Sequence, residues 1–184
     1  YIYGLAIINL LGGGANNIIK YDYTSKMCNC TIRIKGNNNR VVINKACSLN
    51  GVRMLLQGDN NEIILGNRVH INASRSQPTV INACNGTQVH VGDDSLLSNN
   101  IEIHTTDYHT IFDCSGNRLN PDGNIIIGDH VCIGLGVKIL KGSVISDGVI
   151  VGAGSVVAGL YKTPHSIITG VPAKIMREEV SWVE

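Results

Sequence analysis

The sequence is poor in aromatic residues, in net charge and in long apolar runs. Aromatic residues make up only 4% of the 184 residues, which is low for a β-sandwich or a helical core, although 43% hydrophobic residues suffice for one continuous core. A net charge of +1 without a long basic run gives no reason to expect nucleic acid or a membrane surface as the main partner. The apolar opening stretch, residues 1–11, is about half as long as a membrane span, so we expect it to cap the core and no transmembrane segment to be present.

The sequence also lacks a Cys-x-x-Cys pair and the pattern of a secretory signal. Its six cysteines are therefore predicted to be reduced thiols of a cytoplasmic protein, and a structural zinc site is not expected. They are Cys28, Cys30, Cys47, Cys84, Cys114 and Cys132.

An aliphatic residue recurs at a strict interval of six in the C-terminal half of the chain. A helix repeats its buried face at about 3.6 residues and a strand at about 2, so a sustained interval of six indicates short straight runs wound into a closed triangular coil. The pattern predicts a hexapeptide-repeat β-solenoid, an all-β fold of parallel strands. The repeating residues are Ile127, Ile133, Ile139, Ile145, Val151 and Val157.

The same repeat can be traced backwards through four similar strand segments, at residues 39–44, 61–66, 87–92 and 123–128. Their spacings exceed the length of three hexapeptides, which predicts insertions at the corners, including insertions near residues 50–58 and 72–80. Frequent Asn before the clean repeat indicates corner turns and ladders between stacked coils.

Three segments are expected from this pattern. Residues 1–30 form an N-terminal cap with an irregular first coil, and residues 31–160 form the β-helix with a loop insertion at 104–124. Residues 161–184 form a capping segment with a polar, helix-compatible end, because an uncapped coil would expose unpaired strand edges.

The longest insertion concentrates His, Asp, Tyr and Arg in one corner loop, and long loops of compact folds are commonly functional. His109 is the best candidate for a general base, because an imidazole can take a proton from a hydroxyl near neutral pH. Asp107, two residues earlier, is a candidate to orient His109 or to hold a substrate hydroxyl.

The insertion with its TTDYHTI core, the hexapeptide run IGDHVCIGLGVKILKGSVISDGVIVGAGSVVAG and the closing GVPAKIMRE resemble the hexapeptide-repeat acyltransferases, particularly bacterial O-acetyltransferases of capsular and other surface polysaccharides. The resemblance covers about residues 31–178 and implies a left-handed parallel β-helix, whose hand is an exception to the usual crossover rule. It implies direct acetyl transfer from acetyl-CoA to a sugar hydroxyl, with His109 as the base and no metal. It also implies a homotrimer with sites between subunits.

The resemblance assigns further residues to the site. Asn100 matches the position of an acceptor-binding Asn, whereas His104 is a weaker candidate than His109. Coenzyme A is expected to lie beside Cys132, Gly134, Gly152 and Ala153, with Lys174 and Arg177 at its phosphates. Relatives usually have Trp in the place of Cys132, so affinity or acceptor preference is expected to differ. A role for Cys132 as a nucleophile is a weaker alternative.

Three other functions stay open at this point. A zinc enzyme of the γ-carbonic anhydrase type would use His104 and His109 with His90 or His130 as ligands. An N-acetyltransferase acting on a nucleotide-linked amino sugar would differ only in its acceptor. A solenoid that serves only as a scaffold would suit the irregular early coils. Arg75 and Arg118 are candidates to touch an acidic polysaccharide.

Overall fold

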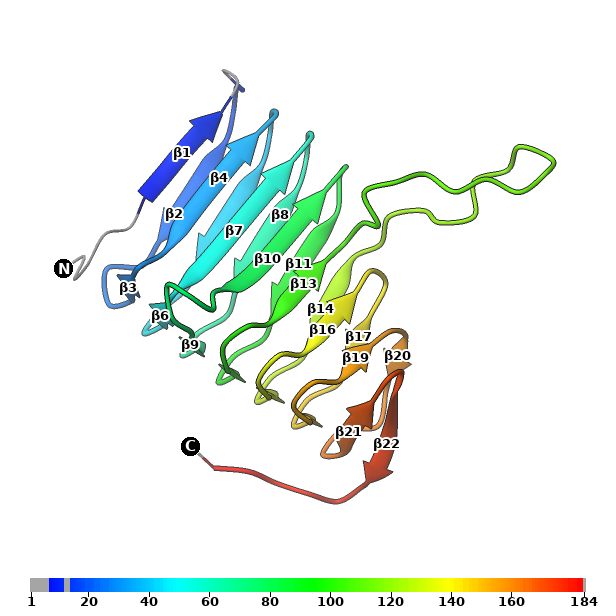
Figure 1. The fold of residues 1–184 in the computed structure, drawn as a ribbon. Helices are drawn as coiled ribbons and strands as arrows, with labels where there is room; N and C mark the ends of the chain where they lie inside the picture. Colours follow the sequence, from blue (N-terminus) through cyan, green and yellow to red (C-terminus); the bar gives the residue numbers. More distant parts are fainter. Residues whose placement is uncertain (1–6, 12–13, 184) are drawn as a thin grey trace.

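The computed structural model describes residues 7–11 and 14–183. It contains three sheets that form the faces of a triangular coil, and their strands are parallel except for the last one (Figure 1). Sheet A contains β1 (Ile7–Leu11), β4 (Thr31–Lys35), β7 (Val52–Gln57), β10 (Thr79–Cys84), β13 (Glu102–His104), β16 (Lys138–Leu140) and β19 (Val156–Val157). Sheet B contains β2 (Ile18–Tyr21), β5 (Arg40–Ile43), β8 (Glu62–Leu65), β11 (Gln88–Val91), β14 (Ile125–Ile127), β17 (Val144–Ile145) and β20 (Leu160–Tyr161). Sheet C contains β3 (Lys26–Cys28), β6 (Ser48–Asn50), β9 (His70–Asn72), β12 (Leu96–Leu97), β15 (Cys132–Ile133), β18 (Ile150–Val151), β21 (Ile167–Gly170) and β22 (Ala173–Arg177).

The interval of six places one buried aliphatic residue on each face of the coil. Ile127 lies in sheet B, Ile133 in sheet C and Ile139 in sheet A, and all three are almost fully buried. Each stacks in register on the next coil, as Ile103 does on Ile139 and Ile139 on Val157. The predicted hexapeptide solenoid is therefore confirmed, with a core of stacked aliphatic columns.

The four segments traced backwards from the clean repeat are β5, β8, β11 and β14, which lie side by side in sheet B in that order. The expected corner insertion near residues 50–58 is wrong, because residues 52–57 form β7. The additional residues of the early coils lengthen the strands of sheet A, where β7 and β10 have six residues and β16 has three. Residues 73–78 do form a corner loop, between β9 and β10.

Asparagines form the expected ladder at the corner between sheets A and B. The Oδ1 atom of Asn39 accepts from the backbone N–H and the side-chain amide of Asn61, at 3.0 and 2.9 Å. Both residues are almost fully buried. The ladder satisfies backbone groups that a corner would otherwise leave without partners.

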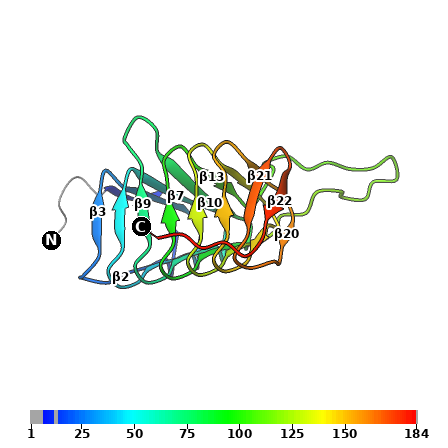
Figure 2. The same cartoon turned by 90° about the horizontal axis from the view of Figure 1, so that it is seen from below.

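The C-terminal end of the chain forms no helix in the described residues, so the helix-compatible reading of this segment is wrong. The β22 strand folds back antiparallel on β21, and its edge position covers the last coil. The chain then runs back along the coils (Figure 2), where the indole of Trp182 stacks on His130 with ring centroids 4.2 Å apart. Parallel strands continue on both sides of the expected boundaries at residues 31 and 160.

Parts of the expected N-terminal cap, residues 1–6 and 12–13, lie outside the described residues. Residues 7–11 form β1 and pair with β4. The described part of the chain contains no helix with the length and hydropathy of a membrane span.

Candidate active site

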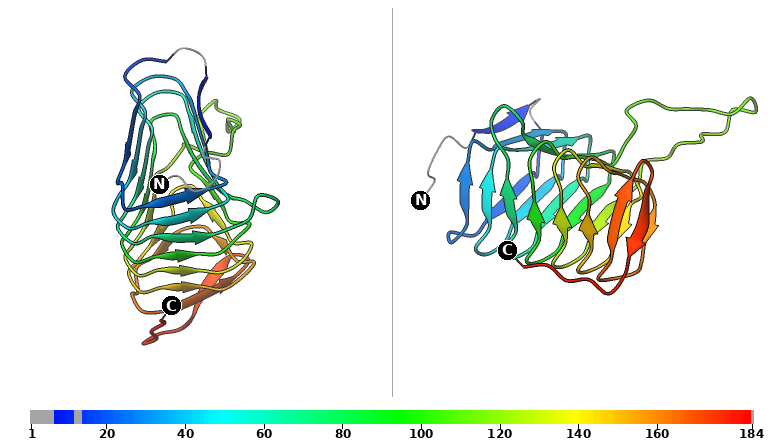
Figure 3. Two further views of the ribbon diagram at one scale, coloured as in Figure 1. Left: turned by 90° about the vertical axis from the view of Figure 1, so that its left-hand side faces the viewer. Right: turned by 60° about the horizontal axis from the view of Figure 1, so that its bottom comes forward.

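The insertion leaves the solenoid between β13 and β14, at the corner between sheets A and B, and projects away from the coils as an arm (Figure 3). We call residues 105–124 the arm. Its outgoing and returning segments run antiparallel, with an isolated bridge between Phe112 and Arg118 and a hydrogen bond from Leu119 N to Ile111 O. The Asp113 carboxylate closes the tip by accepting backbone N–H groups of the following turn. The arm is therefore an ordered hairpin.

Asn120 holds the base of the arm together. It is 8% exposed, and both ends of its side-chain amide are used. Its Nδ2 atom donates to Asp107 Oδ2 at 2.8 Å and to the carbonyl oxygen of His109 at 2.7 Å. Its Oδ1 atom accepts from Ile111 N at 2.7 Å. Asn120 therefore fixes the backbone at His109 and Ile111 and the side chain of Asp107.

Asp107 contacts groups other than the His109 side chain. Its Oδ2 atom lies 2.6 Å from Lys141 Nζ, and Lys141 stands in the turn between β16 and β17. The Lys141 and Asn120 hydrogen bonds lower the pKa of the Asp107 carboxyl, so it is ionised at neutral pH. The ion pair ties the arm to the next coil, and Asp107 is linked to His109 through Asn120.

The two histidines near the arm have different surroundings. His104 is half-buried on β13, and its Nδ1 atom lies 2.8 Å from the hydroxyl of Tyr108, which also accepts a hydrogen bond from Asn82. Burial lowers the pKa of His104, so it is neutral near pH 7. The side chain of His109 is exposed at the base of the arm. Of the two, His109 is the one open to a substrate.

Three of the cofactor-binding candidates, Gly134, Gly152 and Ala153, lie at the corner between sheets C and A, where Gly134 follows β15 and Gly152 follows β18. Asn100, the candidate for acceptor binding, follows β12 at the same corner with a left-handed φ of 55°. A Cβ atom on Gly134 would lie 2.7 Å from the backbone nitrogen of Ala153 on the next coil. Close stacking of the coils is therefore one reason for a glycine at position 134. Ala153, on the next coil, is exposed.

Cys132 faces outward from β15, between Leu96 and Ile150 of the neighbouring strands. Burial raises the pKa of its thiol, so the thiolate needed for a nucleophile is disfavoured at neutral pH. The indole of Trp182 stacks on His130, which precedes Cys132 by two residues in the sequence.

Lys174 and Arg177 are exposed on β22, at the C-terminal edge of sheet C. The predicted site residues thus fall into two groups. His109 and Asp107 lie at one end of the strands of sheet A, and the cofactor candidates lie at the other end of sheet A or on sheet C. One chain does not bring the two groups together.

The proposed zinc ligands are also dispersed. His90 lies on β11 of sheet B, His104 on β13 of sheet A, and His130 at the corner between sheets B and C. Among the described residues, no group of three His, Cys, Asp or Glu side chains could hold a metal ion.

Sequence reasoning missed Asn120, Lys141 and Tyr108. Asn120 precedes Pro121, and an Asn-Pro pair marks a turn, but nothing local indicates which backbone groups it bonds. Lys141 contacts Asp107 only because the next coil stacks beneath the arm.

Comparisons with known proteins agree with this architecture. The chain matches no protein-family model. A polysialic acid O-acetyltransferase of Neisseria meningitidis is 32% identical over 92% of this chain and 86% of its own length. The crystal structure of the polysialic acid O-acetyltransferase OatWY covers 98% of this chain and 92% of its own, at a TM-score of 0.63 and 28% identity. The polySia-specific acetyltransferase NeuO covers 97% and 89%, at a TM-score of 0.73 and 24% identity, which shows a shared fold.

Proposed function

The chain belongs to the hexapeptide-repeat acyltransferases with a left-handed β-helix, and from this premise we propose that it transfers an acetyl group from acetyl-CoA to a hydroxyl of a bacterial surface polysaccharide or its precursor. The observation that carries the proposal is the exposed His109, held at the base of the arm by the buried Asn120. We include a cytoplasmic location in the proposal, because reduced thiols persist there.

His109 acts as the general base in this proposal. Its imidazole takes the proton of the acceptor hydroxyl while the hydroxyl oxygen attacks the carbonyl carbon of the thioester. The C–O bond forms, the C–S bond breaks, and the proton passes from the imidazolium to the departing thiolate. A backbone N–H at a coil corner stabilises the negative charge on the carbonyl oxygen. No covalent acyl-enzyme is required, which agrees with the raised pKa of Cys132.

Acetyl-CoA supplies the acetyl group as an activated thioester. The exposed Ala153 and the adjacent glycines leave little side-chain volume at the corner between sheets C and A, so an extended chain can approach the backbone there. Lys174 and Arg177 supply cations for phosphate groups on the adjoining edge strand. Asn100, at the same corner, is the proposed acceptor-binding residue.

The arm supports a homotrimer with sites between subunits. Four of its apolar side chains are 53 to 60% exposed in the described structure, and they are Tyr108, Ile111, Phe112 and Leu119. Exposed apolar side chains clustered on one element mark interaction surfaces. Docking of the arm on a second copy would cover them and would bring His109 to that copy's cofactor corner.

The direct test is release of free thiol from acetyl-CoA in the presence of oligosaccharide acceptors. We expect His109→Ala to lower the rate by about 10² to 10⁴-fold, the usual contribution of a general base. Thr110→Ala, an exposed neighbour on the arm, is the matched control. A His109→Ala rate equal to the wild-type rate would rule out the base. An acceptor series with amino sugars separates N-acetylation from O-acetylation.

A mixing experiment tests the position of the site between subunits. His109→Ala and Ala153→Tyr proteins, each inactive alone, are co-expressed and purified together. If each site takes His109 from one subunit and the cofactor corner from the next, random trimers regain about a quarter of the wild-type sites. No recovery in trimers shown to be mixed would place the whole site in one subunit.

A further inference from the structure

The first coils of the solenoid carry charge of one sign. Between Asp22 and Asp59 the sequence contains no acidic residue, although the net charge of the whole chain is only +1. The cations of this segment are Lys26, Arg33, Lys35, Arg40, Lys45 and Arg53. A region with cations only is a favourable surface for an anionic ligand.

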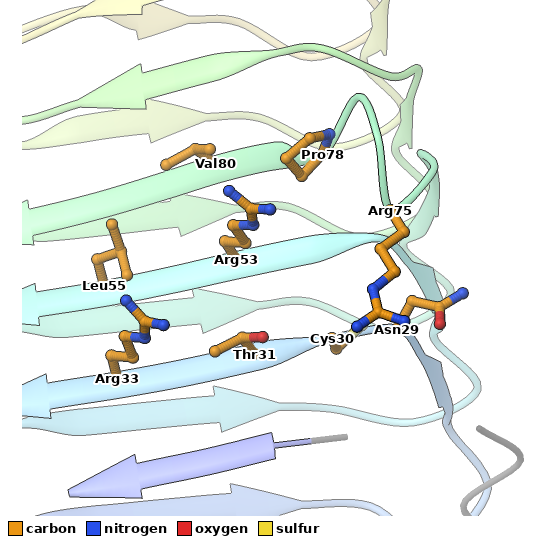
Figure 4. Close-up of a pocket in the computed structure, with 9 residues that line it drawn as sticks. All are labelled: Asn29, Cys30, Thr31, Arg33, Arg53, Leu55, Arg75, Pro78 and Val80. Atoms are coloured by element: carbon orange, nitrogen blue, oxygen red, sulfur yellow. The ribbon is translucent and has the colours of Figure 1, made fainter. Parts of the chain in front are cut away.

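Three arginines of the early coils surround one hollow on the outer face of sheet A. Arg33 extends from β4 and Arg53 from β7, and Arg75 reaches over the edge of the sheet from the loop at residues 73–78 (Figure 4). The alternation of each strand turns Arg33 and Arg53 outward, because Ile32, Ile34, Val52 and Met54 fill the core. Leu55, Pro78 and Val80 form an apolar wall beside the guanidinium groups.

No acidic side chain neutralises these three guanidinium groups within the described residues. Other arginines have such partners, since Arg40 pairs with Glu62 and Arg68 with Asp94. Arg33, Arg53 and Arg75 are exposed and appear in no ion pair of the described chain. Arg33 and Arg53 stand on adjacent strands as diagonal neighbours, because Arg53 pairs in register with Thr31, two residues before Arg33. Such diagonal positions are about 7–8 Å apart, so the like charges repel in the free protein. A bound anion would remove that repulsion.

A continuous row of residues connects the hollow to the base of the arm. Arg33 pairs in register with Leu55, Leu55 with Asn82, and Asn82 with His104. Asn82 and His104 both contact Tyr108, the neighbour of His109. Three strand spacings, about 14 Å, separate Arg33 from His104 along this row. An extended saccharide lying across the strands can therefore reach both places.

We propose that this hollow binds carboxylate groups of an acidic saccharide chain while another part of the same chain occupies the acceptor position near His109. This inference rests on the proposed function. Guanidinium groups match carboxylates in geometry and charge, and the apolar wall suits the less polar face of a sugar ring. The hollow is a remote binding site, so it strengthens binding of a long acidic acceptor without taking part in the chemistry.

The test measures binding without acetyl transfer. His109→Ala protein without acetyl-CoA is titrated calorimetrically with a sialic acid oligomer and with a carboxyl-reduced oligomer of the same length. We expect the acidic oligomer alone to bind, and we expect Arg33→Gln with Arg53→Gln to weaken it at least about tenfold. Arg40→Gln, on sheet B of the same coil, is the control and should bind normally.

Several results would overturn the inference. They are equal binding of the reduced oligomer, unchanged binding by the Arg33→Gln/Arg53→Gln protein, absence of binding by the acidic oligomer, or tighter binding of a single-stranded oligonucleotide of equal charge. Failure here is distinguishable from failure of the proposed function. If the acidic oligomer binds through the arginines but the His109→Ala protein keeps full acetyltransferase activity, only the role of His109 as the base is refuted. If the His109→Ala protein is inactive but the acidic oligomer does not bind through the arginines, only the role of the hollow is refuted.

Discussion

The early coils, up to β13, and the late coils, from β14 onward, share an interior and differ outside it. Both stack aliphatic residues in the same columns, so that Met54, Ile81, Ile103 and Ile139 follow one another in sheet A. The early coils have longer strands, a corner loop and the unpaired arginines. The late coils are regular and carry the proposed cofactor corner. A shared interior period thus leaves the strand length and the outer face free to differ between the early and the late coils.

The largest expected effect tests the shared interior. Ile81→Ala in an early coil and Ile139→Ala in a late coil each remove a fully buried side chain. Each should lower the free energy of unfolding by about 2 to 5 kcal/mol, because the coil cannot collapse around the cavity. Chemical denaturation measures the change. Leu140→Ala, an exposed neighbour, should cost less than about 1 kcal/mol. If only one of the two isoleucine substitutions lowers the free energy of unfolding by this amount, the interiors of the early and the late coils differ.

The interior was predictable from the sequence because it follows a local rule. Every sixth residue from Ile127 to Val157 is buried, and the four earlier segments occupy sheet B as expected. The outer face was less predictable. The run at residues 52–57 alternates as a strand does, but spacing alone does not distinguish a longer strand from a corner loop.

The candidate site was predictable only in part. His109 was chosen as the candidate base because long insertions are commonly functional and an imidazole can take a proton near neutral pH, and its role stays a prediction. Its support by Asn120 and the pairing of Asp107 with Lys141 depend on how the arm folds and how the next coil stacks beneath it. Neither contact follows a sequence period, so neither is visible before the fold is known.

An intermediate effect is expected at the arm. Asn120→Ala removes two donated hydrogen bonds and the acceptor for Ile111 N. We expect kcat to fall about tenfold or more, because a displaced base reacts less well, while KM for acetyl-CoA stays unchanged. Steady-state kinetics measure both. Asn117→Ala, at the tip of the arm, is the control. If Asn120→Ala lowers the free energy of unfolding but leaves kcat unchanged, Asn120 stabilises the fold and does not position His109.

The smallest effect concerns the ion pair between the arm and the late coils. Lys141 and Asn120 lower the pKa of Asp107, so the folded carboxyl titrates below its unfolded value of about 3.9. The ion pair therefore stabilises the folded protein fully above the unfolded pKa of Asp107, and this stabilisation is lost as the pH falls through the lower folded pKa. A partly exposed pair of this kind contributes about 1 kcal/mol. Lys141→Met should return the Asp107 pKa toward its ordinary value in a carbon-detected NMR titration. It should also increase hydrogen exchange at residues 107–111 at neutral pH. If the Asp107 pKa changes but hydrogen exchange at residues 107–111 does not, Asn120 alone holds the base of the arm. The late coils would then stack against the early coils without making any contact that positions His109.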